Sequence, residues 1–313
     1  MYNLAVQDDP ALAMMMSPPL GLVLAAMWGM IWGSFFNVAA YRLASAALED
    51  ESETWLGSAR HALRSLGRLL HPPSACPSCG HAIRWYDNVP ILGWLALRGR
   101  CRDCQAPISA MYPAVEALSG LLAAAVYQRW AVELPGATPI AQIAHFLVYF
   151  YFAGALLVLS LIDAETTLLP LAITLPAIPF YFLCGRALHD ISTVDALLGF
   201  LLGFGSLFLL RNGYRLVTGR EGLGGGDEML VGMVGALLGW RALPVTLFFG
   251  ATLGTLVSVP SILLARRREP AQEGEPALRH VEVPFGPFLA TAAMVYLLFG
   301  KDLQRALESW VIG

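Results

Sequence analysis

The sequence predicts an all-α protein that crosses a membrane about eight times and carries a small metal-binding segment after the first span. Three observations lead to this fold class. The 313 residues are 57% hydrophobic and only 14% charged, whereas soluble domains average about 25% charged residues. Apolar residues gather in blocks of about 20, which is long enough to cross a hydrocarbon core about 30 Å thick. Finally, four cysteines form two Cys-x-x-Cys pairs within one polar segment.

The apolar blocks divide the chain into three expected parts. The first block covers residues 18–42, and we expect it to remain as a span because no small-residue cleavage site follows it. An N-terminal transmembrane helix (1–44), a polar segment (45–110) and a transmembrane core (111–313) are therefore predicted. The further blocks lie near 111–130, 140–162, 168–188, 194–217, 227–243, 244–265 and 284–300.

Basic residues predict the orientation, because short cytoplasmic loops hold more Lys and Arg than external loops. Eight spans place both termini on one side of the membrane. If that side is external, 15 of the 20 basic residues fall inside: eight between Arg42 and Arg102, and seven in later loops. We therefore predict that residues 45–110 and the loop 266–283 are cytoplasmic.

The polar segment begins with a predicted basic amphipathic helix. Apolar residues recur at three- and four-residue steps from Trp55 to Leu70, while Arg60, Arg64 and Arg68 stack on the opposite side. Such a helix could lie in the headgroup layer with its Arg residues toward anionic lipid. It could equally pack on the rest of the segment, and the pattern leaves both interpretations open.

The cysteine pairs predict a metal site in the same segment. Cys76 and Cys79 form the first pair, and Cys101 and Cys104 form the second, with 21 residues between them. Two such knuckles suit tetrahedral zinc. Disulfides are disfavoured in a reducing cytoplasm, and a redox dithiol lacks a thioredoxin-like context. Four thiolates leave no open position, so the predicted role is structural. Cys184, alone in an apolar span, is expected to be a core residue.

Two acidic residues lie at the ends of apolar blocks, where charge is costly and marks function by default. Asp163 ends the third block, and Asp227 opens the sixth after a run of glycines. The predicted topology places both at the cytoplasmic side and at similar depth, so they can meet. Each also has a simpler explanation. Asp163 could be a shallow, solvated helix end, and Asp227 could cap free amides at a helix N-terminus.

Two carboxyl groups at hydrogen-bonding distance share a proton over a wide pH range, as in aspartic proteases. The ionised partner would draw a proton from water while the protonated partner polarises the scissile carbonyl. Gly222 and the run 224–226 would allow close backbone approach where a substrate strand enters. Phosphate binding by this glycine run is disfavoured, since no Lys-Ser/Thr follows it and no strand precedes it.

Together these motifs resemble the type IV prepilin peptidase family of GxGD aspartyl proteases, and the resemblance covers nearly the whole chain. Its motifs stand in the expected order around the two cysteine pairs. They are GSFFNVAAYRL (33–43), IRWYDNVPILGWLALRGRCRDC (83–104), ISAMYPAVE (108–116), IDAETTLLP (162–170) and GREGLGGGD (219–227). The resemblance implies that Asp163 and Asp227 are the catalytic pair.

The resemblance also implies the substrates and the location. It implies a multi-pass protein of the bacterial inner membrane that cuts type IV prepilins or pseudopilins after a short basic leader, on the cytoplasmic face. It further implies methylation of the new N-terminus with S-adenosylmethionine, at residues we leave unassigned. Besides these substrates we expect membrane lipid as a partner and no nucleic acid.

Three positions depart from the family pattern. Met229 stands where a Lys is usual, Met111 stands where an Arg is usual, and Leu171 ends a motif that usually closes on Asp. The peptidase pair survives these changes, whereas methylation is less secure. Because Glu165 and Glu228 point to other helix faces than the pair, their neutral variants should retain cleavage.

Four further polar residues recur in the resembling motifs but lie apart from the aspartates. We expect Asn37, Asn88, Arg98 and Glu116 to support the site rather than perform the cut. The alternatives to a prepilin peptidase are a presenilin-type intramembrane protease, a non-catalytic transporter or assembly subunit, and an inactive scaffold. The cysteine segment speaks against the first, and the lack of internal repeats speaks against a transporter.

Overall fold

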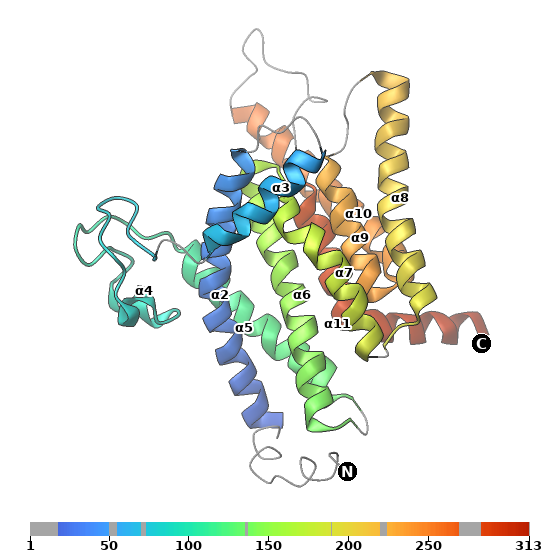
Figure 1. Ribbon diagram of the computed structural model, residues 1–313, viewed down its shortest axis with the longest axis horizontal. Coiled ribbons are helices and arrows are strands. Elements are labelled where there is room, and N and C mark those ends of the chain that lie inside the picture. Colours follow the sequence, from blue (N-terminus) through green and yellow to red (C-terminus); the bar gives the residue numbers. More distant parts are fainter. Residues whose placement is uncertain are drawn as a thin grey trace. The chain divides into compact units, whose positions relative to one another are not determined.

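The computed structural model describes residues 18–49, 55–69, 73–134, 137–188, 190–219, 224–268 and 283–312. Figure 1 shows helices joined by loops, and the described residues contain isolated β-bridges but no strand. The predicted all-α class is therefore confirmed. Residues 269–282 of the loop expected to be cytoplasmic lie outside the described residues, as do Leu70 and Gly222.

The long helices occur in the order of the predicted apolar blocks and at similar positions in the chain. The α-helices are α2 (Pro18–Leu48), α3 (Trp55–Ser65), α4 (Leu92–Ala96), α5 (Met111–Tyr127), α6 (Pro139–Thr166), α7 (Leu171–Leu188), α8 (Thr193–Thr218), α9 (Gly225–Leu238), α10 (Ala242–Arg268) and α11 (Gly286–Ile312). The short helical turns are η1 (Leu66–Leu69), η2 (Trp85–Asn88) and the π-helical η3 (Gln128–Val132).

Five described helices are long and apolar enough to cross a membrane, namely α2, α6, α7, α8 and α10. The other three expected spans correspond to α5, α9 and α11, so the count of eight stays a prediction. The block expected at 227–243 forms a helix of only 14 residues, which is about 21 Å long. It stops early because the backbone of Gly239 has a positive φ of 79°, which leaves the helical region and which glycine adopts easily.

The chain forms two compact units, 1–46 with 63–158 and 47–62 with 159–313. In the first unit, α2 and α5 run antiparallel in close contact through glycine. Gly29 lies against Ser119, and Gly33 lies against Glu116, with no room for a Cβ atom at either glycine. This four-residue glycine spacing is typical of tightly packed membrane helices.

In the second unit, α9 is the central helix. Its residues from Asp227 to Leu237 are buried, apart from Met229, and a helix that is apolar all round belongs inside a protein. It crosses α8 where Gly235 and Gly199 meet backbone to backbone, since a Cβ atom on either would overlap the other. This packing holds the C-terminal half of α9 against α8.

The predicted amphipathic helix corresponds to α3 followed by η1. Ala59 is buried, whereas the Arg60 and Arg64 side chains are exposed. The guanidinium of Arg42 donates to the carbonyl oxygens of Arg68 and Leu69, at 3.0 and 2.8 Å. One face of the helix therefore packs on protein while its Arg face stays open.

Candidate functional site

Each cysteine pair sits in a knuckle of the same backbone design. In the first, Cys76 N–H donates to the His81 carbonyl and Gly80 N–H donates to the Cys76 carbonyl, both at 2.9 Å. In the second, Cys101 and Gln105 make the equivalent bonds at 2.8 and 3.1 Å. The two patterns are offset by 25 residues, from Cys76 to Cys101. The residue after each pair, Gly80 or Gln105, has positive φ.

The four thiols converge as the sequence predicts. Their sulfur atoms all lie within 4.8 Å of one another, and the Cys76 and Cys104 sulfurs are 3.8 Å apart. A tetrahedral ion with metal–sulfur bonds of about 2.3 Å requires sulfur–sulfur distances of about 3.8 Å. The cluster can therefore hold a metal ion without rearrangement of the backbone.

The backbone around Cys76 favours the thiolate that a metal needs. The N–H groups of Cys79 and Ser78 lower the pKa of the Cys76 thiol to about 6, since hydrogen bonds to an anion stabilise it. Metal binding releases the remaining thiol protons.

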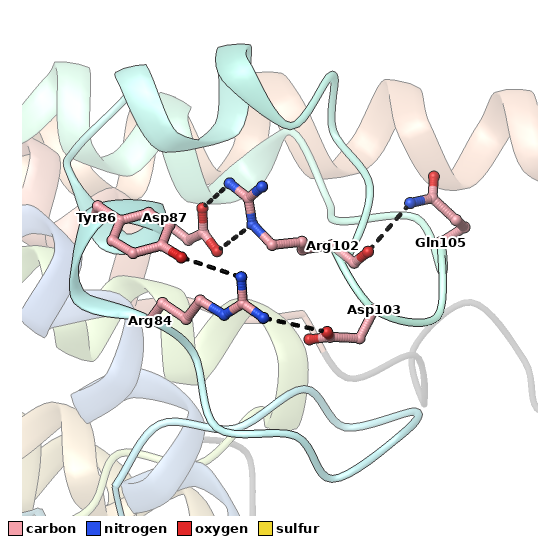
Figure 2. Close-up of polar contacts among 6 residues, drawn as sticks. All are labelled: Arg84, Tyr86, Asp87, Arg102, Asp103 and Gln105. Carbon is pink, nitrogen blue, oxygen red and sulfur yellow. Dashed lines mark hydrogen bonds and ion pairs between the residues drawn. The ribbon is translucent and has the colours of Figure 1, made fainter.

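Charged side chains tie the second knuckle to η2, as Figure 2 shows. The Arg102 guanidinium contacts both carboxylate oxygens of Asp87, with Nε 2.8 Å from Oδ2. Arg84 donates to the Tyr86 hydroxyl at 3.0 Å and lies 3.8 Å from Asp103. The hydrogen bond from Arg102 holds the pKa of Asp87 below its usual range. This network supports the metal segment without using its thiols.

Asp163 lies in the last turn of α6, in the second unit. Its side chain is buried at 4% exposure, and its Oδ2 atom accepts a hydrogen bond of 2.8 Å from the backbone N–H of Gly286. The helix ends just beyond it because Thr167 adopts a left-handed conformation, with φ of 55°, which is strained for a β-branched residue. A shallow, solvated helix end is not what the structure has.

Asp227 lies in the first turn of α9 and is 6% exposed. The N-cap residue is Gly224, which has no side chain to offer a capping bond. The glycines before Asp227 give the turn its shape, because a Cβ atom on Gly226 would overlap Leu169 and one on Gly225 would overlap the Arg211 guanidinium. At Gly226 a side chain would require the backbone to shift, whereas at Gly225 the Arg211 side chain could move aside.

Both aspartates belong to one packed cluster. Leu169 touches Gly226, which precedes Asp227, and its Cδ2 atom would lie 3.2 Å from a Cβ atom on Gly286, whose N–H holds Asp163. The end of α6 and the start of α9, which carry the two buried acids, therefore pack in one cluster around Leu169.

The two glutamates beside the pair differ from each other. Glu165 is exposed, whereas Glu228 is 3% exposed and its Oε1 lies 2.9 Å from the Arg211 Nε of α8. This contact is an ion pair without good hydrogen-bond alignment, since Oε1 has no aligned donor among the described atoms. Glu228 does lie on a different helix face from Asp227, but that face packs against α8, so Glu228 is buried as well.

Comparison with known proteins covers both units. A family model of the Bacterial Peptidase A24 N-terminal domain matches residues 27–130, and one of the Type IV leader peptidase family matches residues 150–259. A Pseudomonas aeruginosa protein named prepilin leader peptidase/N-methyltransferase is 36% identical over 311 residues, covering 95% of this chain and 97% of its own. The chain belongs to the type IV leader peptidase family.

Other relatives of the chain carry the same name. One from Burkholderia pseudomallei strain 1026b is 38% identical over 91% of this chain and 88% of its own, and one from Aeromonas hydrophila is 36% identical over 92% and 94%. No solved structure matches the chain.

The four supporting residues expected from sequence all lie in the first unit of the leader peptidase. Asn37 donates to the carbonyl oxygens of Gly33 and Tyr112, each at 3.2 Å. Glu116 accepts a 2.7 Å bond from the backbone of Ile91. Asn88 lines a cavity of about 250 Å³ beside α2, and Arg98 has positive φ, 52°. The contacts made by Gly286, Leu169 and Arg211 were not expected, because nothing local in the sequence pairs them with the aspartates.

Proposed function

We propose that this chain is a membrane aspartyl endopeptidase that removes the short basic leader of type IV prepilins or pseudopilins. Asp163 and Asp227 would form its catalytic pair. The observation that carries the proposal is the cluster in which Leu169 packs between the segments bearing these two buried carboxyl groups. The names of the relatives support the substrate class.

The two carboxyl groups would act as one unit. Two carboxyl groups that face each other cannot both ionise cheaply, so the pair would share one proton. The ionised group would take a proton from the attacking water, and the protonated group would hydrogen-bond the scissile carbonyl. The Gly286 N–H orients one carboxyl group for this role, since it bonds Asp163 Oδ2 directly.

The exposed glycines offer a place for the scissile strand. Gly224 and Gly225 are exposed immediately before the buried Asp227, and a bare backbone allows an extended peptide to approach closely. Leu169 and Arg211 fill the other sides of the turn. Substrate would therefore reach the pair along the open edge of the glycine turn.

We assign zinc to the four cysteines, with a structural role. The sulfur spacing and the four-thiolate set fit zinc, and a closed set leaves no position for substrate. Bound zinc would cross-link the two knuckles. It would hold together a segment, 45–110, that has little apolar core of its own.

We also propose methylation of the new N-terminus, for which S-adenosylmethionine would supply the methyl group, on the strength of the relatives' name. The cavity beside α2 does not fit the whole of this cofactor, since its volume of about 250 Å³ is below the roughly 300–1,000 Å³ usual for ligand sites. No methylation step is therefore assigned to its lining residues.

The proposed location is the bacterial inner membrane, with the active site facing the cytoplasm. Fifteen basic residues support this orientation, together with the placement of Asp163 and Asp227 at helix ends on the same predicted side. A leader that stays in the cytoplasm, joined to an apolar stem in the bilayer, would reach such a site directly.

The test is mass spectrometry of a prepilin-like substrate incubated with the purified chain in lipid. Cleavage between leader and apolar stem, with a methyl group on the new N-terminus, is the expected result. Cleavage inside the apolar stem would favour the presenilin-type alternative. An intact substrate, with a folded protein and an active leader peptidase as control, would favour a transporter, an assembly subunit or an inactive scaffold.

A further inference from the structure

The metal segment contains an uncharged, apolar stretch, part of which faces outward instead of into the core of the segment. Residues 88–97, NVPILGWLAL, carry no charge, although Arg84, Asp87 and Arg98 surround them. Leu92 and Leu95, one turn apart on α4, are 64% and 57% exposed. Side chains this large are not left open in water over a whole helical face without a reason.

The neighbouring Trp94 shows where the actual core of the segment lies. Its indole N–H donates to the Ile108 carbonyl at 3.1 Å, and its ring lies against Gly99, where a Cβ atom would be 2.8 Å from it. The inner face of α4 is therefore already occupied. Leu92 and Leu95 form a second, outward apolar face, which we call the foot.

The position of the foot along the predicted membrane helices α2 and α5 follows from hydrogen bonds within the same unit. The Ile91 N–H, next to Leu92, donates to the Glu116 carboxylate at 2.7 Å, and Glu116 packs against Gly33 in the middle of α2. Asn37, one turn further along α2, reaches the Tyr112 carbonyl. Figure 1 likewise shows α4 level with the middle of α2 rather than beyond its end.

Helix geometry places this level just below the membrane surface. Starting at residue 18, about 20 residues of α2 suffice to cross the hydrocarbon core, so its cytoplasmic boundary falls near Asn37 and Tyr112. Tyr is typical of that boundary. Glu116 is four residues deeper on α5 than Tyr112, which is about 6 Å. Elements that lie in the interface are buried by about 5–10 Å, and the foot is at this depth.

We propose that α4 is an interfacial membrane anchor, with Leu92 and Leu95 in contact with the acyl chains of the cytoplasmic leaflet. The backbone on both sides of α4 supports an element that is held in a fixed position. Ile91 before α4 and Arg98 after it both have positive φ, at 62° and 52°. The buried Glu116 carboxylate holds the first of these in place. Through α4, the lipid surface fixes the height of the cysteine segment.

A lipid partner fits the foot better than a protein partner. The foot is an uncharged pair of Leu side chains in the same unit as Leu121 of α5, which is 70% exposed and would face the predicted bilayer. A second copy of the chain or an apolar substrate helix would have to displace lipid from the same place. Both remain distinguishable outcomes of one experiment.

The experiment uses the full chain in liposomes of phosphatidylethanolamine and phosphatidylglycerol, with a photo-crosslinking residue in place of Leu95. The same residue at Leu121 is the lipid-facing reference. At Ser78, exposed within the first knuckle, it is the water-facing control. Intact-mass analysis should find a phospholipid adduct at positions 95 and 121 and none at 78. This expectation does not depend on whether the chain cleaves prepilins.

Three results would overturn the anchor. The first is a failure of position 95 to label while position 121 labels. The second is an adduct of 95 with a second copy, and the third is an adduct with an added substrate, without phospholipid in either case. As a second variant, Leu92→Asp should lower the lipid adduct at 95 several-fold, since a charge in the acyl region is costly. Leu92→Ala should lower it much less, and an equal effect of both would contradict the proposal.

Discussion

The cysteine cluster and the aspartate cluster are both polar sites in an apolar protein, but they are held together by opposite means. The cysteine knuckles are shaped by short-range backbone bonds and are surrounded by exposed ion pairs, such as Arg102 with Asp87. The aspartates are buried, and their partners come from segments far along the chain, such as Gly286. The geometry of the cysteine cluster would therefore depend on a bound metal ion, whereas the geometry of the aspartate cluster depends on the packed helices around it.

This difference predicts how each site fails. Removing a metal ligand should disorder one segment and leave the other unit folded, because the knuckles have little apolar core. Changing a carboxyl group in the aspartate cluster should leave the fold intact and remove the chemistry, because packed helices hold the site whatever its charge.

The largest expected effect is the loss of cleavage in Asp163→Asn and Asp227→Asn. Asn keeps the shape but cannot act as base or acid, so each variant should lose at least about the 10²- to 10⁴-fold typical of general acid–base catalysis. The double variant should add little, because the pair acts as a unit. Initial rates of leader removal in lipid measure this.

Glu165→Gln is the matched control for that loss. It neutralises an exposed acid two residues from Asp163 and should cleave at the rate of the unchanged protein. If either Asn variant retained substantial cleavage while folded, that aspartate would leave the catalytic pair.

The second effect concerns the metal. Cys76→Ser or Cys101→Ser should abolish stoichiometric zinc, because structural sites draw an apparent binding free energy of about 10–16 kcal/mol from the complete ligand set. Amide exchange should then rise across 73–108 and stay unchanged in α9. Cys184→Ser, outside the cluster, is the control. Less than a few tenths of an equivalent of zinc in the unchanged protein, with the four thiols free, would reject the assignment.

A third, smaller effect tests the packing beside Asp227. Arg211→Met leaves the Glu228 carboxylate, 3% exposed, without its cation, and breaking a buried pair in this way costs about 3–5 kcal/mol. Glu228→Gln should be milder and keep most cleavage, since Arg211 is 29% exposed and can be hydrated. Thermal unfolding in detergent measures both.

The double variant sharpens this comparison. Arg211→Met with Glu228→Gln should be more stable than Arg211→Met alone, because no unpaired charge remains. Arg215→Met, an exposed residue one turn along α8, is the control and should have little effect. Additive losses for the first two changes would show that the ion pair does not hold the turn.

The smallest effect is expected at Asp87. Its folded pKa is lowered by the bond from Arg102, so the stabilisation is present above the unfolded value near about 3.9 and is lost as pH falls through the lower folded pKa. Asp87→Asn should therefore speed amide exchange around η2 at neutral pH, and the difference should vanish at acidic pH. Asp103→Asn, whose contact with Arg84 is 3.8 Å, should do less at every pH.

The sequence predicted the parts of the molecule whose causes are local. The knuckle at Cys76 and Cys79 forms from neighbouring residues, so the spacing of the two cysteines predicts it. The long apolar blocks form helices because their length and composition favour helices that can cross a membrane. Asp163 and Asp227 were recognisable because a charge beside an apolar block is costly. Their clustering in one unit agrees with the predicted topology, while their catalytic roles stay a prediction.

What could not be predicted depends on tertiary contacts. The bond from Gly286 to Asp163 joins residues 123 positions apart, and the fit of Arg211 under Gly225 requires the crossing of α8 and α9. The early end of α9 at Gly239 was not predicted. A single glycine within an apolar block does not by itself indicate that a helix ends there. The sequence placed Glu228 on a different helix face from Asp227, but it did not predict that Glu228 would be buried on that face.

The repeated knuckle has a consequence for metal affinity. Each Cys pair is a bidentate ligand of the same shape, and the chain between Cys79 and Cys101 tethers one to the other. If the first pair bound a metal ion, the structured link would already hold the second pair beside it, so the effective concentration of the second pair would be high. The segment would thus act as a chelator built from two copies of one ligand. Loss of one pair would cost the tether advantage as well as two bonds to the metal.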